Sequence, residues 1–160
     1  MSRLLALDIS FSTGWACSDG GSGVMNFPND AKATVDPRYY LFHHWVRDLV
    51  NDIEPDVIYI EKPNARYYYA ACALFGMRGI LYSVAAINNC RIEEVSPSSI
   101  KIYATGKGNA KKIDMVNALA VKYPDLVIIN DDHADAIHMM DLGADLELTK
   151  ERLAALKGEV

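Results

Sequence analysis

The chain has 160 residues, of which 51% are hydrophobic and 23% are charged. This length and composition predict one globular domain over residues 1–160 and exclude disordered, collagen-like and coiled-coil proteins. The longest charge-free stretches, residues 67–77 and 79–90, are shorter than the roughly 20 residues that cross a bilayer. Three cysteines stand in no metal-binding spacing, and no apolar leader is visible, which predicts a cytoplasmic protein with reduced, mostly buried thiols.

The net charge of −5 hides an uneven distribution. Residues 62–112 contain eight Lys and Arg against two acids, a balance of +6, whereas the rest of the chain carries −11. A basic central third is suited to a nucleic-acid backbone, and it is equally consistent with chance clustering on an ordinary surface.

The first half of the chain alternates short apolar runs with turns. Apolar runs at residues 3–9, 13–17 and 24–27 predict three strands joined as an antiparallel meander by Gly-rich turns. Helical apolar spacing follows over residues 41–53, and residues 57–60 are typical of a fully buried strand.

The second half alternates helices with strands. The expected elements are a helix at 65–88, a strand at 91–95, a helix that begins after the N-cap pair Ser96-Pro97, and helices at 110–121, 131–142 and 149–156. Residues 126–129 form either a short strand or an apolar plug. The predicted fold class is therefore α/β, with a central mixed five-stranded sheet of three antiparallel strands followed by parallel strands, flanked by helices.

Four acids are candidate metal ligands. Asp8 and Glu61 each end an apolar run, where an uncompensated carboxylate is costly to bury. Asp132 and Asp135 lie three residues apart near a helix start and so share one face. Four converging carboxylates suit Mg²⁺ or Mn²⁺, and two such ions suit in-line phosphoryl transfer. Separate roles as turn and helix-start acids remain open, because composition does not establish convergence.

The order of short motifs is more specific than any one of them. Leu7-Asp8 is followed by Thr13-Gly14, and the later motifs are IYIE at residues 58–61, VSPSSIK at 95–101, TGKGNAKK at 105–112, MV at 115–116 and DHADA at 132–136. In this order they resemble the RuvC-type Holliday-junction resolvases, which have an RNase H-like fold. The resemblance extends from residue 5 to about residue 142.

The resemblance implies a structure-selective endonuclease that resolves four-way and other branched DNA. Asp8, Glu61, Asp132 and Asp135 would hold two Mg²⁺ ions, with Mn²⁺ as a substitute, and the products would carry 5′-phosphate and 3′-hydroxyl ends. The family also implies a homodimer that pairs the helix at residues 70–87 across a two-fold axis.

Several basic and aromatic residues are candidate DNA contacts. Lys101 and Lys112 match the family's phosphate-contacting lysines. The full candidate set is Lys101, Lys107, Lys111, Lys112, Arg66, Tyr67 and Tyr68. Asn64 stands where bacterial members carry a stacking aromatic, so a tyrosine nearby is expected to take over that contact. Together with Ile9-Ser10 in place of Pro-Gly, this departure suggests a phage-type member acting in the host cytoplasm.

Other interpretations remain open at this point. A junction-binding architectural protein would have the same surface without catalysis, although all four acids are present. An RNase H-like enzyme that cuts RNA–DNA hybrids would share the metal site. His133 and His138 flank the acids, and either a metal-facing or an ordinary structural role is compatible with the sequence.

Overall fold

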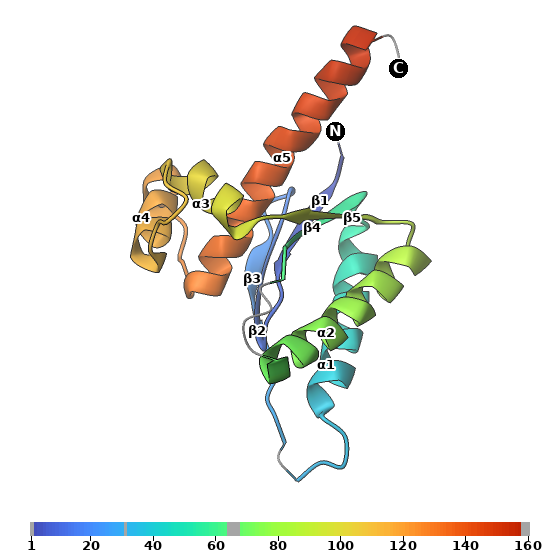
Figure 1. The fold of residues 1–160 in the computed structure, drawn as a ribbon. Helices are drawn as coiled ribbons and strands as arrows, with labels where there is room; N and C mark the ends of the chain where they lie inside the picture. The colour runs from blue at the N-terminus through green and yellow to red at the C-terminus, as the bar shows by residue number, and fades with distance from the viewer. Residues whose placement is uncertain (1, 31, 64–67, 158–160) are drawn as a thin grey trace.

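The computed structural model describes residues 2–30, 32–63 and 68–157, with only the backbone of residues 68–70. Its centre is a five-stranded sheet (Figure 1), in the order β3-β2-β1-β4-β5. The strands are β1 (Leu4–Asp8), β2 (Ser12–Cys17), β3 (Ser22–Asn26), β4 (Val57–Glu61) and β5 (Arg91–Val95). β2 pairs antiparallel with both β1 and β3, whereas β4 pairs in parallel with both β1 and β5. The predicted fold class is confirmed.

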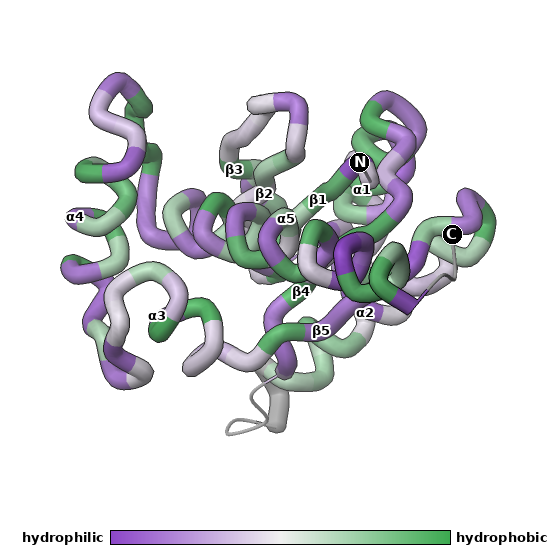
Figure 2. Tube along the Cα trace, turned by 90° about the horizontal axis from the view of Figure 1, so that it is seen from above, coloured by the Kyte–Doolittle hydropathy of each residue, from purple (hydrophilic) through white to green (hydrophobic). Residues whose placement is uncertain are grey.

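The described residues form five helices, which cover the two faces of the sheet (Figures 1 and 2). They are α1 (Pro37–Ile53), α2 (Tyr68–Ile87), α3 (Pro97–Thr105), α4 (Lys112–Lys122) and α5 (Asp131–Lys157). α1 and α2 pack on one face, while α5 crosses the other, with α3 and α4 beside its N-terminal half. The predicted N-cap of α3 is confirmed, because the Ser96 hydroxyl accepts a hydrogen bond from the Ser99 backbone N–H at 3.1 Å.

The alternation of side chains along β1 and β4 separates two apolar cores. Leu5 and Leu7 belong to the core under α1 and α2, whereas Leu4 and Ala6 belong to the core under α3–α5. The same period of two places Tyr59 of β4 in the second core. The last residue of each strand therefore faces α5, which determines where the end-of-strand acids lie.

The long helix α5 differs from the sequence prediction. Residues 131–142 and 149–156 were expected as separate helices, but one helix runs through Asp131–Lys157. Gly143 lets the helix cross close to β4, since a Cβ there would lie 2.7 Å from the Tyr59 ring. Beyond that point the helix is anchored by polar contacts, because the Glu147 carboxylate accepts hydrogen bonds from Tyr59, Arg91 and Lys150. Hydrophobic periodicity does not detect such polar contacts, which is why the sequence predicted two helices instead of one.

The structure also tests the predictions for residues 126–129 and for the cysteines. Residues 126–129 form neither helix nor strand, and Leu126 and Ile128 pack against an apolar cluster of α4, α5 and β2, so the apolar-plug alternative holds. The prediction of mostly buried thiols was wrong, because only Cys17 is buried while Cys72 is exposed on α2. Within the described ranges, no helix is long and apolar enough to span a membrane.

Candidate active site

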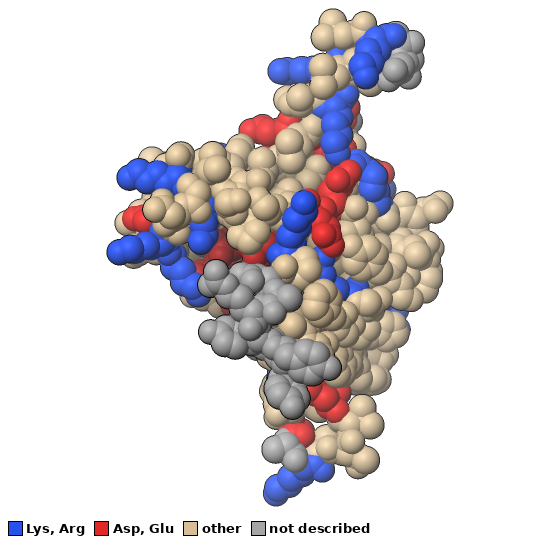
Figure 3. Space-filling model, in the orientation of Figure 1, with Lys and Arg blue, Asp and Glu red and all other residues tan. Residues whose placement is uncertain are grey.

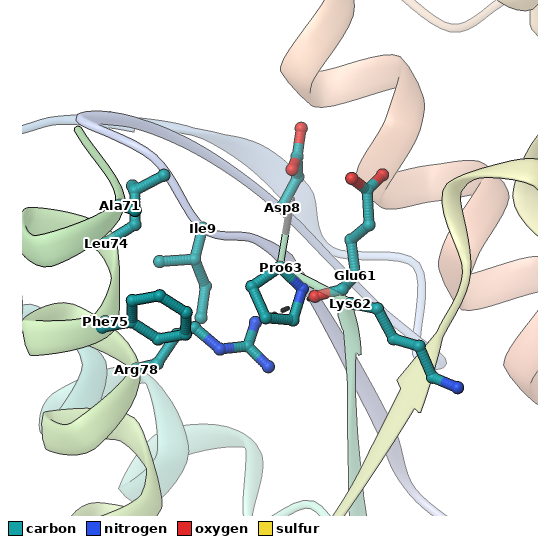
Figure 4. Close-up of a pocket in the computed structure, with 9 residues that line it drawn as sticks. All are labelled: Asp8, Ile9, Glu61, Lys62, Pro63, Ala71, Leu74, Phe75 and Arg78. Atoms are coloured by element: carbon teal, nitrogen blue, oxygen red, sulfur yellow. Dashed lines mark hydrogen bonds between the residues drawn. The ribbon is translucent and has the colours of Figure 1, made fainter. Parts of the chain in front are cut away.

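Asp8 and Glu61 lie side by side at the ends of two parallel strands. The register pairs Leu7 of β1 with Ile60 of β4, so the following residues, both half-buried, are adjacent. Both carboxylates project in the same direction, toward α5 (Figure 4). The sheet therefore brings together two of the four predicted acids.

The start of α5 brings the other two acids to this sheet edge. Gly14 of β2 pairs directly with Asp8, and a Cβ on Gly14 would lie 2.0 Å from the Asp132 carbonyl oxygen. The backbone of α5 thus rests on the one position of β2 that has no side chain. The Asn130 side chain fixes this approach, since its Oδ1 accepts a hydrogen bond from the His133 backbone N–H at 2.9 Å and its Nδ2 donates one to the Ser12 hydroxyl at 3.3 Å.

The four carboxylates interact electrostatically across the site. Burial, together with the charges of Asp135, Glu61 and Asp132, raises the pKa of Asp8 well above its ordinary value. Burial and the charge of Asp131 raise the pKa of Asp135 to about 6. The pKa values of Glu61 and Asp132 are also raised, mainly by burial. The acids therefore form one cluster in which burial and mutual repulsion outweigh the neighbouring cations.

The donor chemistry of this cluster fits a divalent cation. Carboxylate oxygens are the ligands that Mg²⁺ and Mn²⁺ prefer. Among the described residues, none of the four acids forms an ion pair, so their charge has no protein cation in direct contact. Within the same residues, no three His, Cys, Asp or Glu side chains are arranged closely enough to hold a metal ion as they stand.

Two of the predicted DNA-binding lysines lie beside the acids. The charge of Lys101, on α3, lowers the pKa values of both Glu61 and Asp135, although burial dominates both shifts. Lys112, the first residue of α4, forms an ion pair with Asp131, the first residue of α5. Asp131 was missed by the sequence reasoning, and the signal available was the acidic pair that it forms with the next residue.

The other candidate DNA contacts are less closely tied to the acids. Lys107 and Lys111 are exposed between α3 and α4. Figure 3 shows blue side chains along this edge of the molecule, next to the red acidic centre. Arg66 and Tyr67 lie outside the described residues, and so does the side chain of Tyr68. Not every basic residue of the central third faces the acids. Arg91 forms ion pairs with Glu93 and Glu147 instead.

A pocket of about 220 Å³ leads from Asp8 and Glu61 to α2 (Figure 4). Its far wall is apolar and includes Leu74 and Phe75. Arg78 closes it, donating a hydrogen bond to the Glu61 backbone oxygen at 2.8 Å and pairing with a glutamate of β5. This arginine, also missed by the sequence reasoning, holds the end of β4 in place.

The two histidines near the acids have structural partners. The His133 Nδ1 accepts from the Ile129 N–H at 3.2 Å, so its Nε2 carries the proton and donates to the Ser22 hydroxyl at 3.0 Å. The His138 Nε2 donates to the Met115 carbonyl of α4 at 2.9 Å. Both rings are buried and engage neighbouring elements, which supports the structural interpretation of each.

Comparisons with known proteins find relatives both in sequence and in fold. No family model matches the chain. The crossover junction endodeoxyribonuclease RuvC of Chlamydia felis is 28% identical over 110 residues, which cover 66% of this chain and 66% of that protein. The chain thus matches slightly less than two thirds of that relative's length. The protein of the same name from Prochlorococcus marinus is 26% identical over 134 residues, covering 73% of this chain and 83% of the relative.

The fold has close counterparts among solved structures. The structure of Thermus thermophilus RuvC in complex with a Holliday junction substrate superposes with a TM-score of 0.72 at 14% sequence identity. The match covers 88% of this chain and 91% of that one. The five-stranded mixed sheet and its two helical layers are therefore shared over nearly the whole fold. In sequence the chain is thus similar to the crossover junction endodeoxyribonucleases named RuvC, and it shares the fold of the solved RuvC structures.

Proposed function

We propose that the chain is a crossover junction endodeoxyribonuclease that cuts four-way and other branched DNA. The observation that carries this proposal is the cluster of Asp8, Glu61, Asp132 and Asp135, four half-buried carboxylates whose pKa values are raised mainly by burial. Among the described residues, none of the four forms an ion pair. A site that keeps such charge at the end of a sheet is suited to binding cations. Its relatives' name specifies the reaction.

The four carboxylates would hold two Mg²⁺ ions, for which Mn²⁺ would substitute. Bound there, the ions would lower the pKa of an attacking water and stabilise the leaving 3′ oxygen. Lys101 and Lys112, next to the acids, would contact phosphates and offset the repulsion between the DNA and the acidic centre. Lys107 and Lys111 extend this basic edge toward the flanking DNA.

The active unit would be a homodimer, because two opposed strands of a junction need two active sites. The outer face of α2 supports this proposal. Phe75 and Tyr82, seven residues apart and so on one side of this helix, have 48% and 45% of their surface exposed. An apolar helix face of this kind is suited to pairing with its own copy across a two-fold axis. Light scattering coupled to gel filtration would test it, and a strict monomer at micromolar concentration would contradict it.

The primary test is cleavage of a labelled four-way junction, with a linear duplex of matching sequence as control. Wild-type protein with Mg²⁺ or Mn²⁺ should introduce paired symmetric nicks in the junction alone. Cleavage should disappear with EDTA, and Ca²⁺ should not support it, since its looser coordination fits in-line chemistry poorly. The Asp8→Asn variant should bind the junction but not cut it, because it removes a metal ligand rather than a DNA contact.

Other outcomes point to the remaining interpretations. Tight junction binding by the wild type without any nick would favour an architectural protein. Equal cutting of junction and duplex, combined with faster cutting of an RNA–DNA hybrid, would favour an RNase H-like activity. Full cleavage by Asp8→Asn would refute the assignment of the metal site.

A further inference from the structure

The ion pair between Lys112 and Asp131 joins two helix N-termini beside the acidic cluster. A lysine at a helix N-terminus is disfavoured by the helix dipole, whereas an aspartate there is favoured. Asp114 in the first turn of α4 accepts a hydrogen bond from the Lys111 backbone N–H, whereas the ammonium of Lys112 pairs with Asp131 of the other helix. Both residues also line a shallow groove between α4 and the segment that leads into α5.

The pair contributes little to stability. The Lys112 side chain is 79% exposed and that of Asp131 is 34% exposed. Exposed pairs of this kind have small net energies, because solvent screens the charges and ordering the lysine costs entropy. The ion pair therefore determines where the Lys112 ammonium group lies and has little effect on the free energy of folding.

The aspartate is the fixed partner of the two. Asp131 follows Asn130, which is bonded both to β2 and to the first turn of α5, and it precedes Asp132, whose backbone rests on Gly14. Lys112, by contrast, extends from the surface of α4 with several rotatable bonds. The Lys112 ammonium donates a hydrogen bond to the Asp131 carboxylate, so it lies at the start of α5, one residue before Asp132. The charges of Asp131, Asp132 and Asp135 all raise the pKa of Lys112, in agreement with this position.

We propose that Asp131 is a positioning residue that holds the Lys112 ammonium over the acidic cluster, ready to receive the phosphate to be cut. A lysine ammonium has three donors, so one can stay on Asp131 while others contact phosphate oxygens. The role rests on the proposed nuclease function. The site then contains a fifth acid besides the four predicted metal ligands. The partner of this fifth acid, Asp131, is a lysine rather than a metal ion.

A double-mutant cycle tests the proposal. The proteins are wild type, Asp131→Ala, Lys112→Ala and the double variant, measured in single-turnover cleavage of a four-way junction at saturating protein. Asp131→Ala should slow cleavage about ten-fold, since misplacing a contact at the reacting group costs rate. In the Lys112→Ala background the same change should have less than about a two-fold effect, because the group to be positioned is gone.

Junction affinity provides a second measurement, made in EDTA. Asp131→Ala should bind the junction as tightly as wild type or more tightly, because it removes a negative charge near DNA. A residue that only supported the α5 start would lower affinity and rate together. Asp48→Ala serves as the matched control, since Asp48 pairs with Arg47 in an exposed ion pair on α1, and its cleavage rate should be unchanged.

Three results would overturn the inference. They are a wild-type rate in Asp131→Ala, an equal loss of rate in the presence and absence of Lys112, or a parallel loss of junction affinity. The second would indicate that Asp131 acts directly on the metal or on the helix. A wild-type protein that cuts no branched DNA would instead refute the proposed function itself, and with it the role given to Asp131.

Discussion

Neutralising Asp135 should stabilise the metal-free protein although it removes a proposed metal ligand. Burial and the charges of neighbouring aspartates raise the folded-state pKa of Asp135 from 3.8 to about 6. That difference corresponds to about 3 kcal/mol of unfavourable ionisation at neutral pH. The side chain keeps some contact with solvent, which screens part of it, so we expect Asp135→Asn to gain about 1–3 kcal/mol.

The pH dependence has a definite sign. Because the folded-state pKa is raised, the ionised Asp135 destabilises the folded protein, and this destabilisation is complete above pH 6. It fades as the pH falls toward 3.8, the ordinary pKa of an aspartate. The gain from Asp135→Asn should therefore shrink to about 1 kcal/mol or less at pH 4.5. Urea unfolding in EDTA at pH 7.5 and pH 4.5 would measure both values.

Glu147 on the same helix is the matched control, with the opposite sign. Burial would raise its pKa, but hydrogen bonds from Arg91, Lys150 and Tyr59 outweigh burial and lower it from 4.5 to about 2. Glu147→Gln should destabilise the protein by about 2–3 kcal/mol at pH 7.5, and most of this loss should persist at pH 4.5. If Asp135→Asn destabilised the metal-free protein at pH 7.5 as well, the carboxylate cluster would not be the source of electrostatic strain.

Three further outcomes are expected. Gly14→Ala should cost about 1–3 kcal/mol in urea unfolding and slow junction cleavage, because its Cβ would meet the Asp132 backbone, whereas Gly79→Ala, with open space around it, should be neutral or stabilising; equal effects would contradict the close approach. Lys112→Ala should weaken junction binding and lower the slope of log affinity against log salt by about one, and an unchanged slope would rule out a phosphate contact. The Mg²⁺ concentration needed for half-maximal cleavage should rise as the pH drops below about 6, because Asp135 of the metal-free protein becomes protonated there and protons compete with the ion; an unchanged Mg²⁺ requirement down to pH 5 would contradict its role as a ligand.

The amino-acid sequence by itself determined the strands, most helices and the candidate acids. Apolar runs of four or five residues mark β1 and β4, and the acid that ends each run is visible in the same window. The start of α3 is equally local, since Ser96 and Pro97 act on their own turn. These features depend on neighbours a few residues away, so periodicity and capping rules predict them.

Only the tertiary structure decided which groups meet. The Asp132 backbone lies over Gly14, the residue of β2 that pairs with Asp8, a relation between residues more than a hundred positions apart. The pairing of Lys112 with Asp131 and the unbroken course of α5 past Glu147 likewise depend on contacts between elements. Local sequence rules cannot register such contacts, because packing and strand register, rather than chain neighbours, set the distances between these charges.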